Sequence, residues 1–250
     1  MSDRDRHIGL ERCFNFRDLG GYETVDGRQV RWQAVYRSDS LHRLSGTDLE
    51  CAQELGLRTV IDLRATGELD RHGRFAHAHD VSFHHLPIIE EGSVHFTPLQ
   101  PDDPEPLPGV GYLDMATTGR ASIAAALQVI GGGEHPVVFH CAAGKDRTGI
   151  VAALLLSSLN VPDALIAADY HLSERAIRPA LAWAEENDPG MVAEIGRLPE
   201  WAFLAREPTV TAFLDMLRER HGSIEAYLVD AGVEIATLDA LRTRLLVENP

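Results

Sequence analysis

The 250-residue chain has one lysine, three cysteines and no long apolar run. No run approaches the roughly 20 apolar residues that cross a bilayer, so we expect no stable membrane insertion. The opening residues, MSDRDRHIGLERC, carry charges with no apolar stretch behind them, unlike a Sec-type signal peptide. We therefore expect residence in the cytoplasm, and export by an unusual route stays open.

The cysteines, Cys13, Cys51 and Cys141, are widely spaced and odd in number. This pattern fits neither a disulfide framework nor a paired-cysteine zinc site. It fits a reducing compartment, which a reactive thiolate would also need.

Positive charge is scarce, since the formal net charge is −15. Such a balance argues against nucleic acid as a partner and against general adhesion to anionic membranes. The 23 basic residues are all arginine except Lys145. Because a residue type used once stands inside the motif described below, we treat Lys145 as a candidate functional residue.

Histidine is concentrated in one stretch, where six of the 12 fall between positions 72 and 95. They are His72, His77, His79, His84, His85 and His95. Their spacing fits neither a helical i, i+4 pair nor a closed zinc pattern, and adjacent strand residues point to opposite faces. We expect scattered polar histidines here, with no metal and no cofactor.

Short apolar strands alternate with helices along the first two thirds of the chain. Strands are predicted at 58–64, 81–88 and 136–141, and helices at 111–130 and 149–159. The helix at 149–159 is apolar on almost all faces, so it should be buried. This alternation predicts an α/β fold with a mostly parallel central sheet flanked by helices.

The last third of the chain, about 162–250, has a helical pattern. We expect residues 1–250 to form a single domain in which this part covers one side of the sheet or forms a movable cap or lid. The loop 90–109 holds five prolines. A loop of that length is uncommon inside a compact domain unless it is a lid or a substrate loop.

The segment HCAAGKDRTG, residues 140–149, runs from a predicted strand directly into a predicted helix. A cysteine attacks phosphorus as its thiolate and ordinarily holds its proton up to about pH 8.5. The inward N–H groups of such a loop and the helix dipole stabilise both a thiolate at Cys141 and a bound phosphate. The small residues Ala142, Ala143 and Gly144 let the loop curl into an anion nest. We predict a phosphate-binding loop with Cys141 as nucleophile, rather than a buried inert cysteine.

The other motif residues have distinct expected roles. The planar fork of Arg147 can grip two phosphate oxygens, Thr148 can donate a hydrogen bond to the sulfur, and His140 should order the loop. The rival nucleotide-binding pattern G-x4-G-K-[ST] fails, because Phe139 stands in place of glycine and Asp146 in place of Ser or Thr.

HCAAGKDRTG matches the signature of the cysteine-dependent tyrosine phosphatases, and it resembles most the bacterial tyrosine/serine phosphatases whose loop reads HCxAGKDRTG. FNFRDLGGY, VYRSDSL and VIDLRATGE are similar to that family's N-terminal motifs in the same order. The resemblance implies a phosphatase-type α/β fold and phosphotyrosine hydrolysis, with phosphoserine, phosphothreonine and phosphoinositide hydrolysis in some members. The implied partners are phosphorylated proteins or phosphoinositides, and the oligomeric state stays open. Lys145-Asp146 is shared with lipid-phosphate-hydrolysing relatives, in which the lysine is thought to contact a second phosphate.

An acid should protonate the leaving oxygen in the first step. The chain lacks the Trp-Pro-Asp tripeptide of conventional tyrosine phosphatases. Asp146 lies inside the phosphate loop, whereas Asp102 and Asp103 lie in the proline-rich loop. The resemblance favours Asp146, and the other two stay as alternatives.

Asp62 and Arg64 end a predicted strand at the edge of the sheet where ligands bind in such folds. Asp62 would orient the loop or Arg147, or else form a structural ion pair, so both residues are supporting candidates. Arg17 and Asp18, in NFRDLGG, are expected to pair near a glycine turn.

Three functions follow from these residues. The first is a protein-tyrosine phosphatase that forms a cysteinyl-phosphate. The second is a non-catalytic module that binds phosphorylated ligands on the same scaffold. The third is a thiol redox or arsenate-reducing enzyme, which needs Cys13 or Cys51 close to Cys141 as a resolving cysteine.

Overall fold

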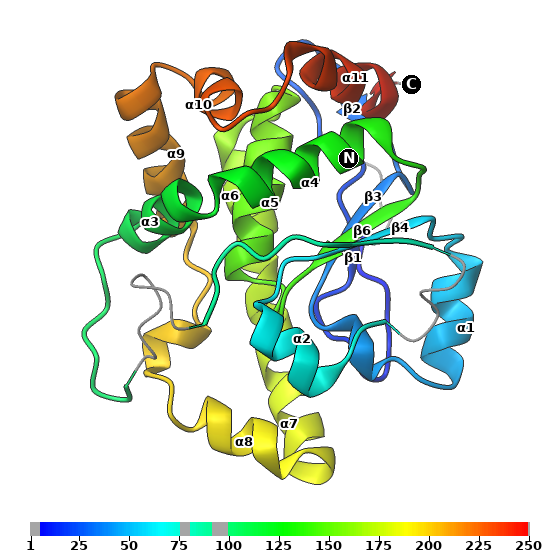
Figure 1. Ribbon diagram of the computed structural model, residues 1–250, viewed down its shortest axis with the longest axis vertical. Coiled ribbons are helices and arrows are strands. Elements are labelled where there is room, and N and C mark those ends of the chain that lie inside the picture. Colours follow the sequence, from blue (N-terminus) through cyan, green and yellow to red (C-terminus); the bar gives the residue numbers. More distant parts are fainter. Residues whose placement is uncertain (1–5, 76–80, 92–99, 250) are drawn as a thin grey trace.

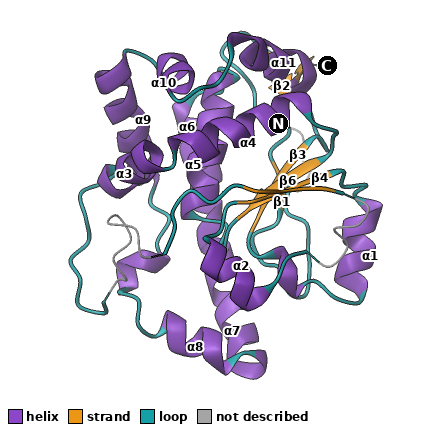
Figure 2. Ribbon diagram, in the orientation of Figure 1, coloured by secondary structure: helices purple, strands orange, loops and turns teal. Residues whose placement is uncertain are grey.

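A five-stranded sheet of order β1-β3-β6-β4-β5 forms the centre of the protein in a computed structural model, which describes residues 6–75, 81–91 and 100–249. Its strands are β1 (Arg17–Asp18), β3 (Val35–Ser38), β4 (Thr59–Asp62), β5 (Ser82–His85) and β6 (Val137–His140). β1 is antiparallel to β3, and the other pairs are parallel. The predicted mostly parallel sheet flanked by helices is confirmed (Figures 1 and 2).

Both faces of the sheet are covered, which explains why its strands are apolar runs rather than alternating patterns. Tyr36, Val60 and Val138 lie in register on neighbouring strands and belong to the smaller of two hydrophobic clusters. The next residues along β4 and β6, Ile61 and Phe139, point the other way into the larger cluster. The central strands are therefore held from both sides.

The smaller cluster joins one face of the sheet to η1 (Leu41–Arg43) and α1 (Thr47–Glu54). α2 (Thr66–His72) follows β4 and has no buried residue. The larger cluster joins the other face to seven helices of the described chain. These are α3 (Val110–Thr118), α4 (Arg120–Gly132), α5 (Asp146–Ser158), α6 (Asp163–His171), α9 (Glu207–His221), α10 (Ile224–Asp230) and α11 (Ile235–Leu245).

The remaining elements lie at the margins. η2 (Leu172–Ala176), α7 (Ile177–Asn187), α8 (Pro189–Ile195) and η3 (Glu200–Phe203) follow α6 in that order. Figure 1 shows α7 and α8 at the bottom of the molecule, away from the sheet. A separate two-stranded sheet pairs β2 (Arg28–Val30) with β7 (Leu246–Glu248), which ties the C-terminal end to the N-terminal region.

One predicted helix is divided in two. The pattern at 111–130 indicated a continuous helix, but α3 ends before Gly119 and α4 begins after it. A β-carbon at Gly119 would lie 2.5 Å from the carbonyl oxygen of Ile88. The chain bends where this close approach requires a glycine.

α5 is buried along almost its whole length, as its apolar composition predicted. The motif at 140–149 begins at the last residue of β6 and ends in the first turn of α5, so it joins a buried strand to a buried helix. None of the helices in the described ranges is long and apolar enough to cross a membrane.

Candidate active site

Cys141 follows directly on β6, and residues 141–145 form a loop that leads into α5. The Cys141 side chain is buried, with 2% of its surface exposed. Gly144 has a φ of +67°, and a β-carbon there would lie 2.6 Å from the carbonyl oxygen of Ser38. Glycine is therefore required where the loop turns against β3.

The carbonyl groups in the first half of the loop are hydrogen-bonded to donors outside it. The backbone N–H and the hydroxyl of Ser40 both donate to the Ala142 oxygen at 3.1 Å. The Ser40 hydroxyl also lies 3.3 Å from the Cys141 oxygen. Asn15 Nδ2 donates to the Ala143 oxygen at 2.9 Å.

The second half of the loop follows the same pattern. Arg37 Nη2 donates to the Gly144 oxygen at 2.8 Å and lies 3.4 Å from the Lys145 oxygen. The backbone N–H of Gly149 donates to the Lys145 oxygen at 2.7 Å. Every carbonyl from residue 141 to residue 145 is thus engaged.

These contacts determine where the loop amides point. In a trans peptide the C=O and the following N–H point in opposite directions, so a carbonyl held from outside turns the next N–H inward. Within the described residues, the N–H groups of residues 142–145 have no protein acceptor. The loop therefore presents inward amides beside Cys141 at the N-terminus of α5, an arrangement that binds anions.

Arg147 lies in the first turn of α5 and is held by Glu68 of α2. Both terminal nitrogens donate to the two Glu68 oxygens, and Nη2 lies 3.0 Å from Oε1. Glu68 also accepts the Ala65 backbone N–H at 2.8 Å, which starts α2. Burial alone would lower the pKa of Arg147, but the Cys141 sulfur and Glu68 raise it above its usual value, so the guanidinium stays charged.

Thr148 and His140 flank the loop and are fully buried. The Thr148 hydroxyl has no hydrogen-bond partner among the described residues, which leaves it available to a sulfur or a ligand. His140 Nδ1 lies 3.3 Å from the Cys141 oxygen. Burial lowers the pKa of His140, although the nearby Asp62 opposes that shift.

Asp62 pairs with Arg64 rather than with Arg147. Arg64 Nη2 donates to Asp62 Oδ2 at 2.6 Å, and both side chains are buried. Asp62 Oδ2 also lies 3.6 Å from His140 Nε2. The carboxylate on Arg147 is that of Glu68, to which the sequence argument gave no role.

The expected pairing of Arg17 with Asp18 is wrong. The two residues are adjacent on β1, so their side chains point to opposite faces. Arg17 pairs with the buried Asp169 of α6, and Asp18 accepts the backbone N–H groups of Gly20 and Gln33, each at 2.8 Å.

The candidate acids differ in their surroundings. Asp146 is the first residue of α5, its side chain is 42% exposed, and Oδ1 accepts the Tyr112 hydroxyl at 2.6 Å. Asp102 is exposed, and Asp103 Oδ2 accepts the Gln100 backbone N–H within its own turn. Asp146 adjoins the phosphate loop in the chain, and Asp103 contacts Trp201 of η3 through its carbonyl oxygen.

The Lys145 side chain points to residues 202–204, in the C-terminal third of the chain. Its ammonium group donates to the carbonyl oxygens of Ala202 and Leu204, the latter at 3.2 Å, and lies 3.4 Å from Asp146 Oδ1. The three donors of an ammonium are therefore all engaged. A second phosphate would have to displace residues 202–204 from Lys145.

The segment around η3 also contacts the proline-rich loop. Trp201 Nε1 donates to the Asp103 carbonyl oxygen at 2.8 Å, and Arg206 pairs with Glu105 at 2.8 Å. These contacts connect Lys145 to residues 103–105 through η3. The part of that loop at 92–99 lies outside the described residues.

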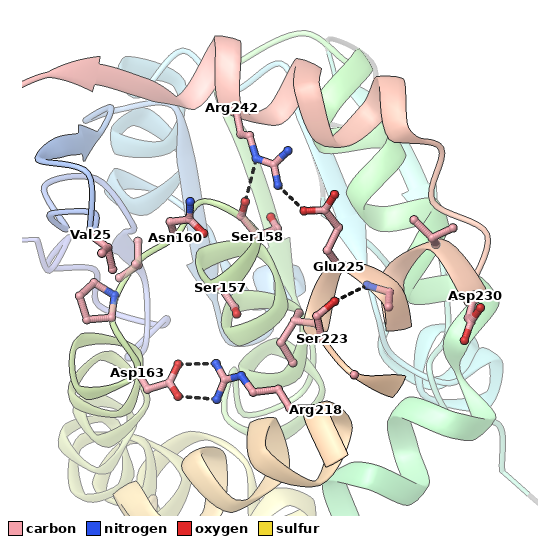
Figure 3. Close-up of a pocket in the computed structure, with 16 residues that line it drawn as sticks. Val25, Ser157, Ser158, Asn160, Asp163, Arg218, Ser223, Glu225, Asp230 and Arg242 are labelled. Atoms are coloured by element: carbon pink, nitrogen blue, oxygen red, sulfur yellow. Dashed lines mark hydrogen bonds and ion pairs between the residues drawn. The ribbon is translucent and has the colours of Figure 1, made fainter. Parts of the chain in front are cut away.

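A hollow of about 900 Å³ lies at the other end of α5 (Figure 3). A 13-residue helix spans about 20 Å, so this hollow is far from the phosphate loop. Its two arginines are neutralised: Arg218 pairs with Asp163 at 2.6 Å and Arg242 with Glu225 at 2.7 Å. The hollow therefore offers an anion no unpaired cation.

The histidine-rich stretch is only partly described, because His77, His79 and His95 lie outside the described residues. His84 contacts Ser82, and His85 Nε2 lies 2.9 Å from the Arg64 carbonyl oxygen. Within residues 6–75, 81–91 and 100–249, no three His, Cys, Asp or Glu side chains gather as a metal site.

Sequence reasoning missed the residues outside the motif that shape the loop. Asn15, Arg37 and Glu68 lie in the three N-terminal segments that resemble the phosphatase family. The resemblance therefore pointed to these segments, but it assigned no role to these three residues. Asp169 lies outside every quoted motif. No feature of the sequence around it distinguished it from a helix-surface aspartate.

The match to known families covers nearly the whole chain. The model described as "Tyrosine phosphatase family" matches residues 8–247. This range includes the three N-terminal segments, the phosphate loop and α9 to α11.

Three curated proteins from bacteria are similar to the chain. A provisionally named tyrosine-protein phosphatase of Cupriavidus necator is 36% identical over 68% of this chain, and the match spans 64% of that protein, less than two thirds of its length. The triple specificity protein phosphatase PtpB of Mycobacterium tuberculosis is 26% identical over 95% of this chain and 98% of its own. A tyrosine-protein phosphatase of Nostoc commune is 29% identical, and the match spans 85% of this chain and 74% of that protein.

Among solved structures, the core catalytic domain of the PP-IP phosphatase Siw14 of S. cerevisiae matches 73% of this chain and 90% of its own, with 16% identity and a TM-score of 0.35. Another structure of the Siw14 catalytic core gives a TM-score of 0.40 at 14% identity, over 76% of this chain and 94% of that chain. Similarities of this size support no conclusion about activity.

Proposed function

Since this chain belongs to the tyrosine phosphatase family, we propose that it is a protein-tyrosine phosphatase acting through a cysteinyl-phosphate on Cys141. One observation carries the proposal: the N–H groups of residues 142–145, which follow carbonyls held from outside the loop, have no acceptor within the described residues. Arg147, aligned by Glu68, stands at the same site.

In the first step the Cys141 thiolate attacks phosphorus, and the bond from phosphorus to the substrate oxygen breaks. The leaving oxygen takes a proton from Asp146, whose half-exposed carboxyl is held by the Tyr112 hydroxyl. The loop amides and the Arg147 fork stabilise the charge on the equatorial oxygens. No metal takes part in this scheme.

In the second step water attacks the cysteinyl-phosphate, and the Asp146 carboxylate accepts its proton. The bond between sulfur and phosphorus breaks and Cys141 leaves as a thiolate. In this scheme the Thr148 hydroxyl, which is buried and has no hydrogen-bond partner in the described chain, turns to donate to that sulfur. This hydrogen bond makes the thiolate a better leaving group.

The substrate range extends to phosphoserine, phosphothreonine and phosphoinositides under this proposal. The relative from M. tuberculosis carries the name triple specificity phosphatase, which supports the broader range. Lys145 supplies the contact to a second phosphate after it exchanges the Ala202 and Leu204 carbonyls for phosphate oxygens.

We further propose that the chain works as one domain whose residues 200–206 form the part of the C-terminal third that caps the site. Their contacts with Lys145 and with residues 103–105 support this assignment. Cytoplasmic residence is part of the proposal, because the attacking thiolate needs a reducing compartment.

The redox alternative is disfavoured by the other two cysteines. Burial, together with Asp39, raises the pKa of Cys13 well above its usual value. Burial and the acidic residues beside it also raise the pKa of Cys51. A thiol with a raised pKa is less often present as the thiolate, which disfavours thiol exchange at Cys13 and Cys51.

The test of the proposed function is Cys141→Ser, compared with Cys51→Ser. We expect the first variant to lose hydrolysis of an aryl phosphate and of a phosphotyrosine peptide while still binding inorganic phosphate. Cys51→Ser should keep both properties, because Cys51 lies on α1. Retained turnover in Cys141→Ser would refute the mechanism, and absence of turnover in the wild type would favour the non-catalytic binding module.

The substrate range is tested with Lys145→Met. We expect this variant to lose more activity on a phosphoinositide bearing two or more phosphates than on a phosphotyrosine peptide. An equal loss on the two substrates would argue against a second phosphate contact.

A further inference from the structure

We propose that Asp169 is a positioning residue for the phosphate loop: from one buried carboxylate, two chains of hydrogen bonds hold the Ala143 and Gly144 carbonyls outward. The inference rests on the proposed function for its catalytic meaning, but its anion-binding consequence is independent of turnover. Asp169 lies on α6, outside the loop motif and outside the three N-terminal segments named in the sequence analysis.

Asp169 is 1% exposed and uses both carboxylate oxygens. Oδ1 accepts Arg17 Nε at 3.0 Å and the Tyr22 hydroxyl at 3.0 Å, and Oδ2 accepts Arg37 Nη1 at 2.6 Å. Burial raises the pKa of Asp169, but the two guanidinium groups lower it by more than burial raises it. The carboxylate therefore stays ionised. A charge buried this deeply is retained only because each oxygen is paired.

The first chain runs through Arg37. One end of its guanidinium is held by Asp169, and the other end donates to the Gly144 oxygen at 2.8 Å. Because the guanidinium is planar, fixing Nη1 on the carboxylate also fixes the direction of Nη2. The Gly144 carbonyl is thereby held outward, and the Lys145 N–H is turned into the loop.

The second chain runs through Arg17 and Asn15. Arg17 is held by Asp169 and donates through Nη1 to Asn15 Oδ1. The Asn15 amide must then present its NH2 group on its other side, where it donates to the Ala143 oxygen at 2.9 Å. The Gly144 N–H is therefore turned inward by a carboxylate that touches no loop residue directly.

Positioning and simple electrostatics predict opposite results when Asp169 is neutralised. The buried group of Arg17, Arg37 and Asp169 carries two positive charges and one negative charge beneath the loop. If only charge mattered, removing the negative charge would strengthen anion binding. If Asp169 positions the carbonyls, removing it should weaken anion binding in spite of the added positive potential.

The experiment compares Asp169→Asn with Tyr22→Phe. Asparagine keeps the shape but replaces one acceptor oxygen with a donor that cannot accept from an arginine. Tyr22→Phe removes a hydrogen bond to the same carboxylate that leads to no loop residue. The readouts are the dissociation constant for inorganic phosphate and the rate of Cys141 alkylation by iodoacetamide at pH 7, located by peptide mass spectrometry. Both are measured well below the melting temperature of each variant.

We expect Asp169→Asn to bind phosphate about tenfold more weakly and to be alkylated about tenfold more slowly, which corresponds to one lost charge-assisted hydrogen bond. Tyr22→Phe should stay within about twofold of the wild type in both readouts, because both arginines keep their carboxylate. Unchanged or tighter phosphate binding in Asp169→Asn would overturn the proposal.

Asn15→Ala keeps the test decisive if Asp169→Asn does not fold. It cuts the chain to Ala143 and leaves the chain through Arg37 intact, so we expect a smaller but measurable weakening of phosphate binding. Wild-type phosphate affinity in Asn15→Ala would refute the role of that chain. A wild type that binds phosphate but hydrolyses no aryl phosphate would refute the proposed function and leave this test valid.

Discussion

The two sides of the phosphate loop contact different kinds of residues. On the inner side, the loop carbonyls meet Asn15, Arg37 and Ser40, which are all at most 4% exposed. On the outer side, Lys145 donates to backbone carbonyls, and Asp146, whose side chain is 42% exposed, accepts the Tyr112 hydroxyl. Under the proposed function, the inner side fixes the geometry that an anion needs, and the outer side exchanges its contacts when a ligand binds. The predictions below test this difference.

The largest effect is expected from breaking the inner side at Arg37. In Arg37→Met the Asp169 carboxylate loses a buried partner, so the free energy of unfolding should fall by about 3–5 kcal/mol. The matched surface variant is Arg242→Met, whose partner Glu225 is half exposed, with an expected loss of less than about 1 kcal/mol. Urea denaturation measures both, and similar losses would show that burial does not distinguish the two pairs.

Glu68→Gln probes the carboxylate that aligns Arg147. The amide can no longer accept from both guanidinium nitrogens, so kcat/KM for an aryl phosphate should fall about tenfold to hundredfold. Glu91→Gln is the control, because Glu91 pairs with Arg71 at a more exposed position. A kcat/KM for Glu68→Gln within twofold of the control would contradict the assigned role.

Acid should reduce the stability that the inner side contributes. Arg17 and Arg37 overcome burial and lower the pKa of Asp169, so its contribution to stability is complete above the unfolded value, about 3.9, and is lost as the pH falls below that value. The free energy of unfolding should therefore fall from pH 5 toward pH 2, and less steeply in Asp169→Asn. Equal slopes for the two proteins would mean that folding does not lower the pKa of Asp169.

The smallest effect is expected on the outer side. Trp201→Phe removes the hydrogen bond to the Asp103 carbonyl, which is worth about 0.5–1.5 kcal/mol. Amide hydrogen exchange across 200–206 should become a few-fold faster, while exchange in β6 stays unchanged. Lys145→Met should accelerate exchange in the same segment. No change in either variant would indicate that other contacts hold η3 in place.

The sequence predicted the phosphate loop because its chemistry is local. A nucleophile, small residues and an arginine lie within ten consecutive positions between a strand and a helix, and that placement is confirmed. The mostly parallel sheet and the family were also predicted correctly, since apolar runs alternating with helices and several ordered motifs carry that information. The roles of the individual site residues stay proposals.

Contacts between residues far apart in the chain could not be predicted from the sequence. Arg17 and Asp169 are 152 positions apart, and nothing in the segment around Asp169 indicates a buried carboxylate. Arg17 was therefore paired with its neighbour Asp18, which faces the other way. The bend at Gly119 lies where Ile88, in the segment after β5, approaches the chain closely, so a helical pattern could not reveal it. Lys145 was a candidate because it is the chain's one lysine. Its two carbonyl partners belong to Ala202 and Leu204, in a segment whose path the sequence did not predict.

The single lysine makes the outer side of the loop chemically addressable. Lys145 carries the chain's one side-chain amine, and in the structure the residue is 8% exposed and its amine is hydrogen-bonded to two carbonyls. An acylating reagent can therefore label only this side chain and the N-terminus. The rate at which Lys145 is labelled therefore measures how often residues 202–204 separate from it. Acetylation of Lys145 would also remove the positive charge from the outer side.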